Sequence, residues 1–109
     1  MGLSYGREKF QAATLTLVSS LPLRERINNA VSNFLVYLID EDLPSEAVQE
    51  FNHLLKRVTG LEEKLDEGLS FRISSLSNYQ LEAIAERIVA LHIVLCEAYE
   101  MKKTLNHFY

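Results

Sequence analysis

The sequence predicts an all-α fold: an irregular four-helix bundle, a single helical domain over residues 1–109, with a long C-terminal helix as its spine. Three observations predict this. Apolar residues recur at spacings of three and four along most of the chain, as they do on one face of an α-helix. Both prolines stand where a helix would begin. Residues 78–103 contain no glycine or proline, and their centre, 88–96, is almost uninterruptedly apolar, which is typical of a helix covered on several sides.

We expect the first helix over residues 6–20, with Ser4 as a possible cap. The second is expected over 22–39, with Pro22 in its first turn. Residues 34–39 are apolar all round, a second indication that the protein buries more than one helical face. The apolar faces of these two helices consist of Phe10, Ala13, Leu17 and Leu21, and of Ile27, Ala30, Val31, Phe34, Leu35 and Leu38.

The third helix is expected over residues 44–59, after an acidic turn at 40–42 that is unfavourable at the negative end of a helix dipole. Pro44 marks its first turn and Gly60 its C-terminal stop. Residues 61–76 are expected to be an ordered linker pinned by Phe71. Leu69, Phe71 and Ile73 alternate with polar residues, but a single strand would have nothing to pair with.

The last helix is expected over residues 78–103, with a frayed tail at 104–109. Ser77 and Gln80 form a capping box, and Leu76 and Leu81 form the hydrophobic staple around it. Two apolar stripes follow. The first should meet the chain's own helices, and the second is where a second subunit would sit. The first stripe consists of Leu81, Ile84, Ile88, Leu91, Leu95 and Ala98, and the second of Val89, Ile93 and Cys96.

Charge and composition exclude several classes of partner. The formal net charge of −4 argues against nucleic acid and against an acidic membrane. A helix-turn-helix over the second and third helices would present three acids to DNA phosphates. No apolar run is long enough to cross a membrane.

The single cysteine, Cys96, excludes an intrachain disulfide and indicates a buried thiol in a reducing compartment, so we expect a cytoplasmic protein.

Two pairs of residues have the spacing of metal ligands. Glu50 and His53 form an E-x-x-H pair on one helical face, as in carboxylate-bridged metal bundles, but the chain has no second copy of this motif. His92 and Cys96 are four residues apart, a spacing that suits two zinc ligands, with no obvious third. An exposed helix face and a core histidine beside a thiol are the simpler interpretations, so no metal or cofactor is expected.

No phosphate-binding loop or nucleophile motif is present, and we expect no enzyme activity. The leading hypothesis is a non-enzymatic protein-interaction module that forms a homodimer, because the apolar circumference exceeds what three partner helices can cover. The alternatives are a metal- or small-molecule-binding bundle that uses Glu50, His53 and His92, or an acidic regulator that binds a transcription factor or toxin. The expected interface consists of Val89, Ile93, Cys96, Val36 and Ile39.

Overall fold

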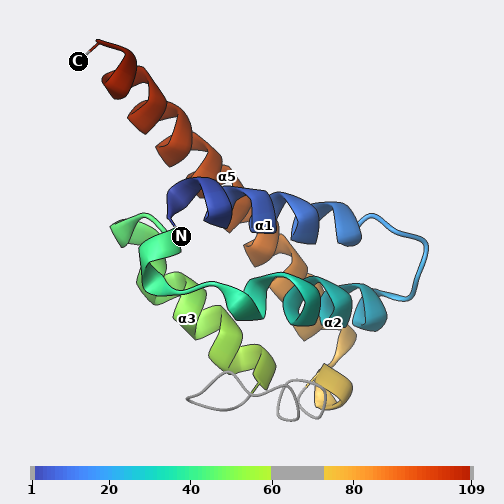
Figure 1. Cartoon of the computed structure of the whole chain (residues 1–109). Coiled ribbons are helices and arrows are strands. Elements are labelled where there is room, and N and C mark those ends of the chain that lie inside the picture. The colour runs from blue at the N-terminus through green and yellow to red at the C-terminus, as the bar shows by residue number, and fades with distance from the viewer. Residues whose placement is uncertain (1, 60–72, 109) are drawn as a thin grey trace.

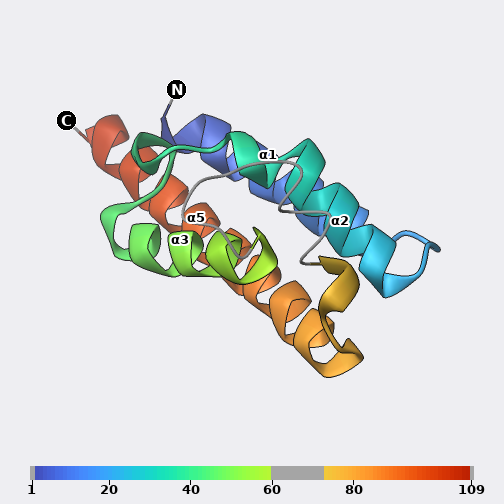
Figure 2. The ribbon, with the colours of Figure 1, turned by 90° about the horizontal axis from the view of Figure 1, so that it is seen from below.

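The computed structural model describes residues 2–59 and 73–108, with side chains up to 105. Three helices, α1 (Leu3–Thr16), α2 (Leu23–Asn33) and α3 (Ser45–Thr59), all contact the long helix α5 (Asn78–Phe108). α1 and α2 lie side by side and α5 crosses them (Figure 1). α3 runs along α5 in the view from below (Figure 2). The predicted all-α bundle with a long C-terminal helix as its spine is confirmed.

The core forms where the apolar faces of all four helices meet. The first predicted stripe of α5 is confirmed as its core face from Leu81 to Leu95, because none of these five side chains is more than 1 % exposed. Its last member, Ala98, is only partly buried. Phe10 of α1 and Phe51 of α3 meet edge to face within this core, with ring centroids 5.7 Å apart. No helix in the described part of the chain is long and apolar enough to span a membrane.

α1 begins and ends earlier than predicted, at Leu3 and Thr16 instead of residues 6 and 20. Ser4 therefore lies inside the helix and is not its cap. The start of α1 is held by a residue 40 positions further along the chain, because the Gly2 N–H donates to the Asp42 carboxylate at 2.7 Å. Beyond Thr16 the turn is held by Arg26 of α2, which donates to the carbonyls of Leu17 and Leu21.

The continuous helix predicted over 22–39 is wrong. α2 ends at Asn33, and the chain continues as two short 3₁₀ turns, η1 (Leu35–Tyr37) and η2 (Asp40–Asp42). This irregular path buries Leu35 and Leu38 and leaves Tyr37 and Ile39 more than half exposed. The change from α-helical to 3₁₀ backbone therefore decides which apolar side chains of residues 34–39 are buried. Both η1 and η2 pack against α1.

α3 begins at Ser45, one residue later than predicted. Gly60 and Phe71, and with them the predicted stop and most of the predicted linker, lie outside the described residues. Residues 73–75, at the end of that linker, form a helical turn. Arg24 of α2 fixes this segment by donating to the carbonyls of Ile73 and Leu76.

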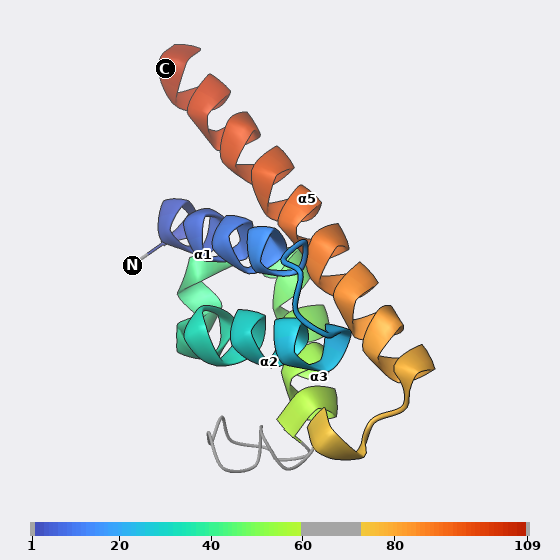
Figure 3. The ribbon, with the colours of Figure 1, turned by 90° about the vertical axis from the view of Figure 1, so that its right-hand side faces the viewer.

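α5 begins at Asn78, as predicted, and the capping box is confirmed. The Ser77 N–H donates to Gln80 Oε1 at 2.9 Å, and the Gln80 N–H donates to Ser77 Oγ at 3.2 Å. The predicted fraying from residue 104 is wrong, since α5 continues to Phe108. The last turns of α5 extend beyond the other helices (Figures 1 and 3).

Candidate functional site

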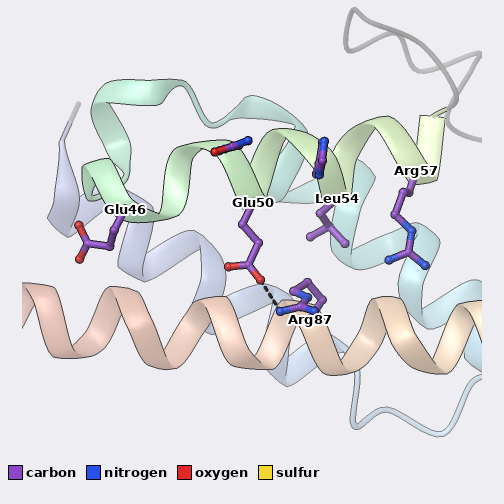
Figure 4. Close-up of a pocket in the computed structure, with 7 residues that line it drawn as sticks. Glu46, Glu50, Leu54, Arg57 and Arg87 are labelled. Carbon is purple, nitrogen blue, oxygen red and sulfur yellow. Dashed lines mark hydrogen bonds and ion pairs between the residues drawn. The ribbon is translucent and has the colours of Figure 1, made fainter.

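A polar groove of 370 Å³ lies between α3 and α5. Glu50 of α3 reaches across it to an ion pair with Arg87 of α5 (Figure 4). Both side chains are about half exposed, so water screens the pair and it contributes little to stability. The groove is lined by Glu46, Gln49, Glu50, His53, Leu54, Arg57 and Arg87.

The structure places both members of the E-x-x-H pair, Glu50 and His53, in this groove. The sequence did not reveal that Arg57 and Arg87 line it as well, and both are cations that oppose a bound metal ion. Among the described residues, no group of three or more His, Cys, Asp or Glu side chains is placed to hold a metal ion. The groove can hold a small polar molecule, and its lining residues include no serine, threonine, cysteine or lysine.

The second predicted pair, His92 and Cys96, lies on α5, and Arg7 of α1 is close enough to His92 to affect its pKa. The Cys96 sulfur is 3.6 Å from His92 Nε2, and the thiol is partly exposed, whereas burial was expected. Burial lowers the pKa of His92, and the nearby positive charge of Arg7 lowers it further. The Arg7 guanidinium itself stacks on the Tyr99 ring, 4.3 Å from its centroid. His92 is therefore a neutral, partly buried histidine beside a cation, a setting that again does not favour a metal.

The predicted interface residues differ in their exposure. Val89 is 37 % exposed, Ile93 is 51 % exposed and Cys96 is partly exposed, all on α5. Ile39, just before η2, is 51 % exposed. Val36 of η1 is only 9 % exposed, so this side chain offers little surface to a partner.

The surface that sequence reasoning missed is the end of α5. Leu95 is the last buried residue of α5 among the described side chains. Residues 97–108 form what we call the arm, in which Met101 is 68 % exposed and Leu105 is 52 % exposed. At its base, a pocket of 220 Å³ is lined by Leu3, Ser4, Tyr99, Lys102 and Lys103. The arm could have been found by continuing the three-and-four spacing past Ala98, through Met101 and Leu105.

Comparisons with protein-family models, with curated proteins and with solved structures found no match for this chain.

Proposed function

We propose that this chain is a non-enzymatic protein-interaction module that forms a twofold homodimer through the arm. The observation that carries the proposal is the exposure of Met101, at 68 %, and of Leu105, at 52 %, on the part of α5 that extends past the other described helices. Together with Ala98 they recur at spacings of three and four, so they share one side of the helix. A second copy of this side would cover both large apolar side chains.

The charges of the arm are compatible with a second copy. Glu97 and Glu100 are balanced by Lys102 and Lys103 on the next turn, so pairing two arms accumulates no net charge over these residues. A closed twofold contact is also the commonest way in which identical chains associate.

The position of the arm favours an antiparallel arrangement. Because the arm extends past the other helices, two arms can lie alongside each other with the two bodies at opposite ends (Figure 3). In that arrangement the end of one arm, with Leu105, meets the base of the other near Ala98, which lies on the same side of the helix. Short isolated helices are marginal in water, so cover from a partner would also stabilise the last turns of α5.

We place this function in the cytoplasm, because the one cysteine of the chain, Cys96, is a partly exposed thiol that an oxidising compartment would leave open to oxidation.

Sedimentation equilibrium over a concentration series tests the dimer. We expect the wild-type chain to sediment as a dimer and the Met101→Glu and Leu105→Glu variants as monomers with unchanged helix content. Leu15→Glu is the matched control, since Leu15 of α1 is 63 % exposed and lies outside the arm. A wild-type chain that sediments as a monomer, or arm variants that remain dimeric, would overturn the proposal.

A further inference from the structure

One side of α5 carries two exposed apolar side chains between two pairs of acids. We call this the outer stripe. Its members recur at spacings of three and four, so they lie on one side of the helix, and all six are exposed. At 1.5 Å per residue the stripe is about 27 Å long. It consists of Glu82, Glu86, Val89, Ile93, Glu97 and Glu100.

The stripe contains no positive group, because the cations of α5 lie elsewhere. Arg87 is paired with Glu50 on α3. Lys102 and Lys103 line the pocket at the base of the arm. Arg7, which α1 brings to this helix, is stacked on Tyr99. The four carboxylates therefore give the outer stripe a negative field. Among the described side chains of α5, Lys103, three positions after Glu100, offsets this field only at the C-terminal end of the stripe.

This charge pattern decides against a second copy on the outer stripe, although the sequence favoured one at Val89 and Ile93. Acids stand at both ends of the stripe, so a copy laid along it in either direction puts glutamates against glutamates. Such like-charge contacts lie well within the screening length of about 8 Å at physiological salt. Nucleic acids and anionic membranes are repelled for the same reason.

We propose that the outer stripe binds a basic amphipathic helix of another protein. Two apolar residues of that helix would cover Val89 and Ile93, and lysines or arginines on either side would lie next to the two pairs of glutamates. Charges at such a rim steer association and fix orientation, while the central apolar contact supplies the burial. The inference rests on the proposed function in that the chain acts by binding proteins, but it uses a different side of α5 from the arm contact at Met101 and Leu105.

A designed peptide tests this inference on the full-length chain. The probe is an alanine-based helix of about 20 residues, long enough to follow the stripe, with two central leucines and two lysines on each side of them on the same face. A second peptide carries glutamates in place of the lysines. We expect calorimetry to detect binding of the lysine peptide alone, and amide chemical shifts to change within residues 82–100.

Variants of the stripe sharpen the test. Glu86→Gln with Glu97→Gln should weaken binding of the lysine peptide about fivefold, the effect of two exposed ion pairs. Ile93→Ala should weaken it about tenfold by removing apolar contact area. The matched control is Glu8→Gln with Glu25→Gln, which removes two exposed acids outside α5 and should leave the affinity within about twofold.

Equal binding of the two peptides, stripe variants that bind like wild type, or a control that weakens binding as much as the stripe variants would overturn the inference. The two experiments distinguish a failure of the dimer proposal from a failure of the outer-stripe inference. A chain that sediments as a monomer but binds the lysine peptide refutes the arm contact only, and a dimer that does not bind the peptide refutes the outer stripe only.

Discussion

Gly6 of α1 lies against the backbone carbonyl of Asp42, so closely that a Cβ on residue 6 would overlap the carbonyl oxygen. The same Cβ would also lie 3.3 Å from the Leu95 side chain of α5. The Asp42 carboxylate strengthens the junction by accepting the backbone N–H groups of Gly2 and Ile39, at 2.7 and 3.0 Å. The contact between Gly6 and Asp42 holds η2 against the start of α1. It also fixes the position at which α1 crosses α5.

Gly6→Ala should therefore destabilise the protein. Helix propensity alone predicts a gain of about 1 kcal/mol for this change. The overlap with a backbone atom cannot be relieved by a side-chain rotation, so we expect a net loss of about 1–3 kcal/mol in the free energy of unfolding. Urea denaturation measures it, with Ser4→Ala on the exposed side of α1 as the control. A Gly6→Ala variant as stable as wild type would show that α1 does not approach η2 as described.

Asp42→Asn should remove charge from two backbone hydrogen bonds in a nearly fully buried site, since Asp42 is 1 % exposed. We expect a cost of about 1.5–3 kcal/mol at neutral pH, as for hydrogen bonds to charged groups.

The pH dependence of Asp42→Asn supplies an independent check. Burial raises the pKa of Asp42, but the net shift is downward because of effects that include the two backbone hydrogen bonds. A lowered carboxyl pKa gives stability that is present above the ordinary value of 3.8 and is lost as the pH falls through the folded-state pKa. The acid limb of the stability curve below about pH 4 should therefore be shallower in Asp42→Asn than in wild type. Parallel acid limbs would contradict this account.

His92 should make the protein less stable in mild acid. Its pKa is lowered by burial and by Arg7, so below pH 6.5 the unfolded chain binds a proton that the folded chain does not. The free energy of unfolding should fall from pH 6.5 downward until the folded-state pKa is reached, and His92 should have no effect well above pH 6.5.

Unfolding curves of wild type and His92→Gln, recorded between about pH 8 and pH 5, test this. We expect the substitution to reduce the decline below pH 6.5. The matched control is His53→Gln, which removes the same type of residue from the exposed side of α3. An unchanged decline in His92→Gln would rule out this histidine as its source.

Ser77→Ala should cost about 1 kcal/mol, because the Gln80 N–H at the start of α5 would lose its acceptor. Ser77→Thr retains a hydroxyl and should restore most of the loss. Thermal unfolding checks both variants, and Tyr79→Ala is the control, since Tyr79 is 82 % exposed on the same turn. Equal stability of the alanine and threonine variants would mean that the cap contributes nothing.

Local patterns predicted the fold best where the interactions are local. The capping box of Ser77 and Gln80 joins residues three apart, and the core stripe of α5 follows from helical periodicity, so neither needed knowledge of distant residues. The run at 34–39 failed as a prediction because apolar composition does not specify backbone geometry. Whether Leu35 and Leu38 are buried by an α-helix or by a 3₁₀ turn depends on how η1 and η2 meet α1.

Each candidate site likewise combines residues that spacing alone identified with a residue that only the fold brings close. Glu50 and His53 could be named from their spacing, but their chemistry depends on Arg87, which is 37 residues from Glu50. His92 and Cys96 could be named as a pair, yet Arg7 of α1 alters the setting of His92. The arm was missed because the tail was expected to fray, although it contains no glycine or proline to end the helix.

By itself the sequence determined that the chain has four main helices, where α5 starts and which of its faces is core, because these follow from periodicity and capping along a single helix. Only the tertiary structure decided that α2 stops at Asn33, that Asp42 clamps the start of α1, and that α5 extends past its neighbours with an arm and an acid-lined stripe exposed. These depend on contacts between residues far apart in the sequence, such as Gly2 and Asp42, which are 40 positions apart, and the free energy of such contacts is not encoded in any local pattern.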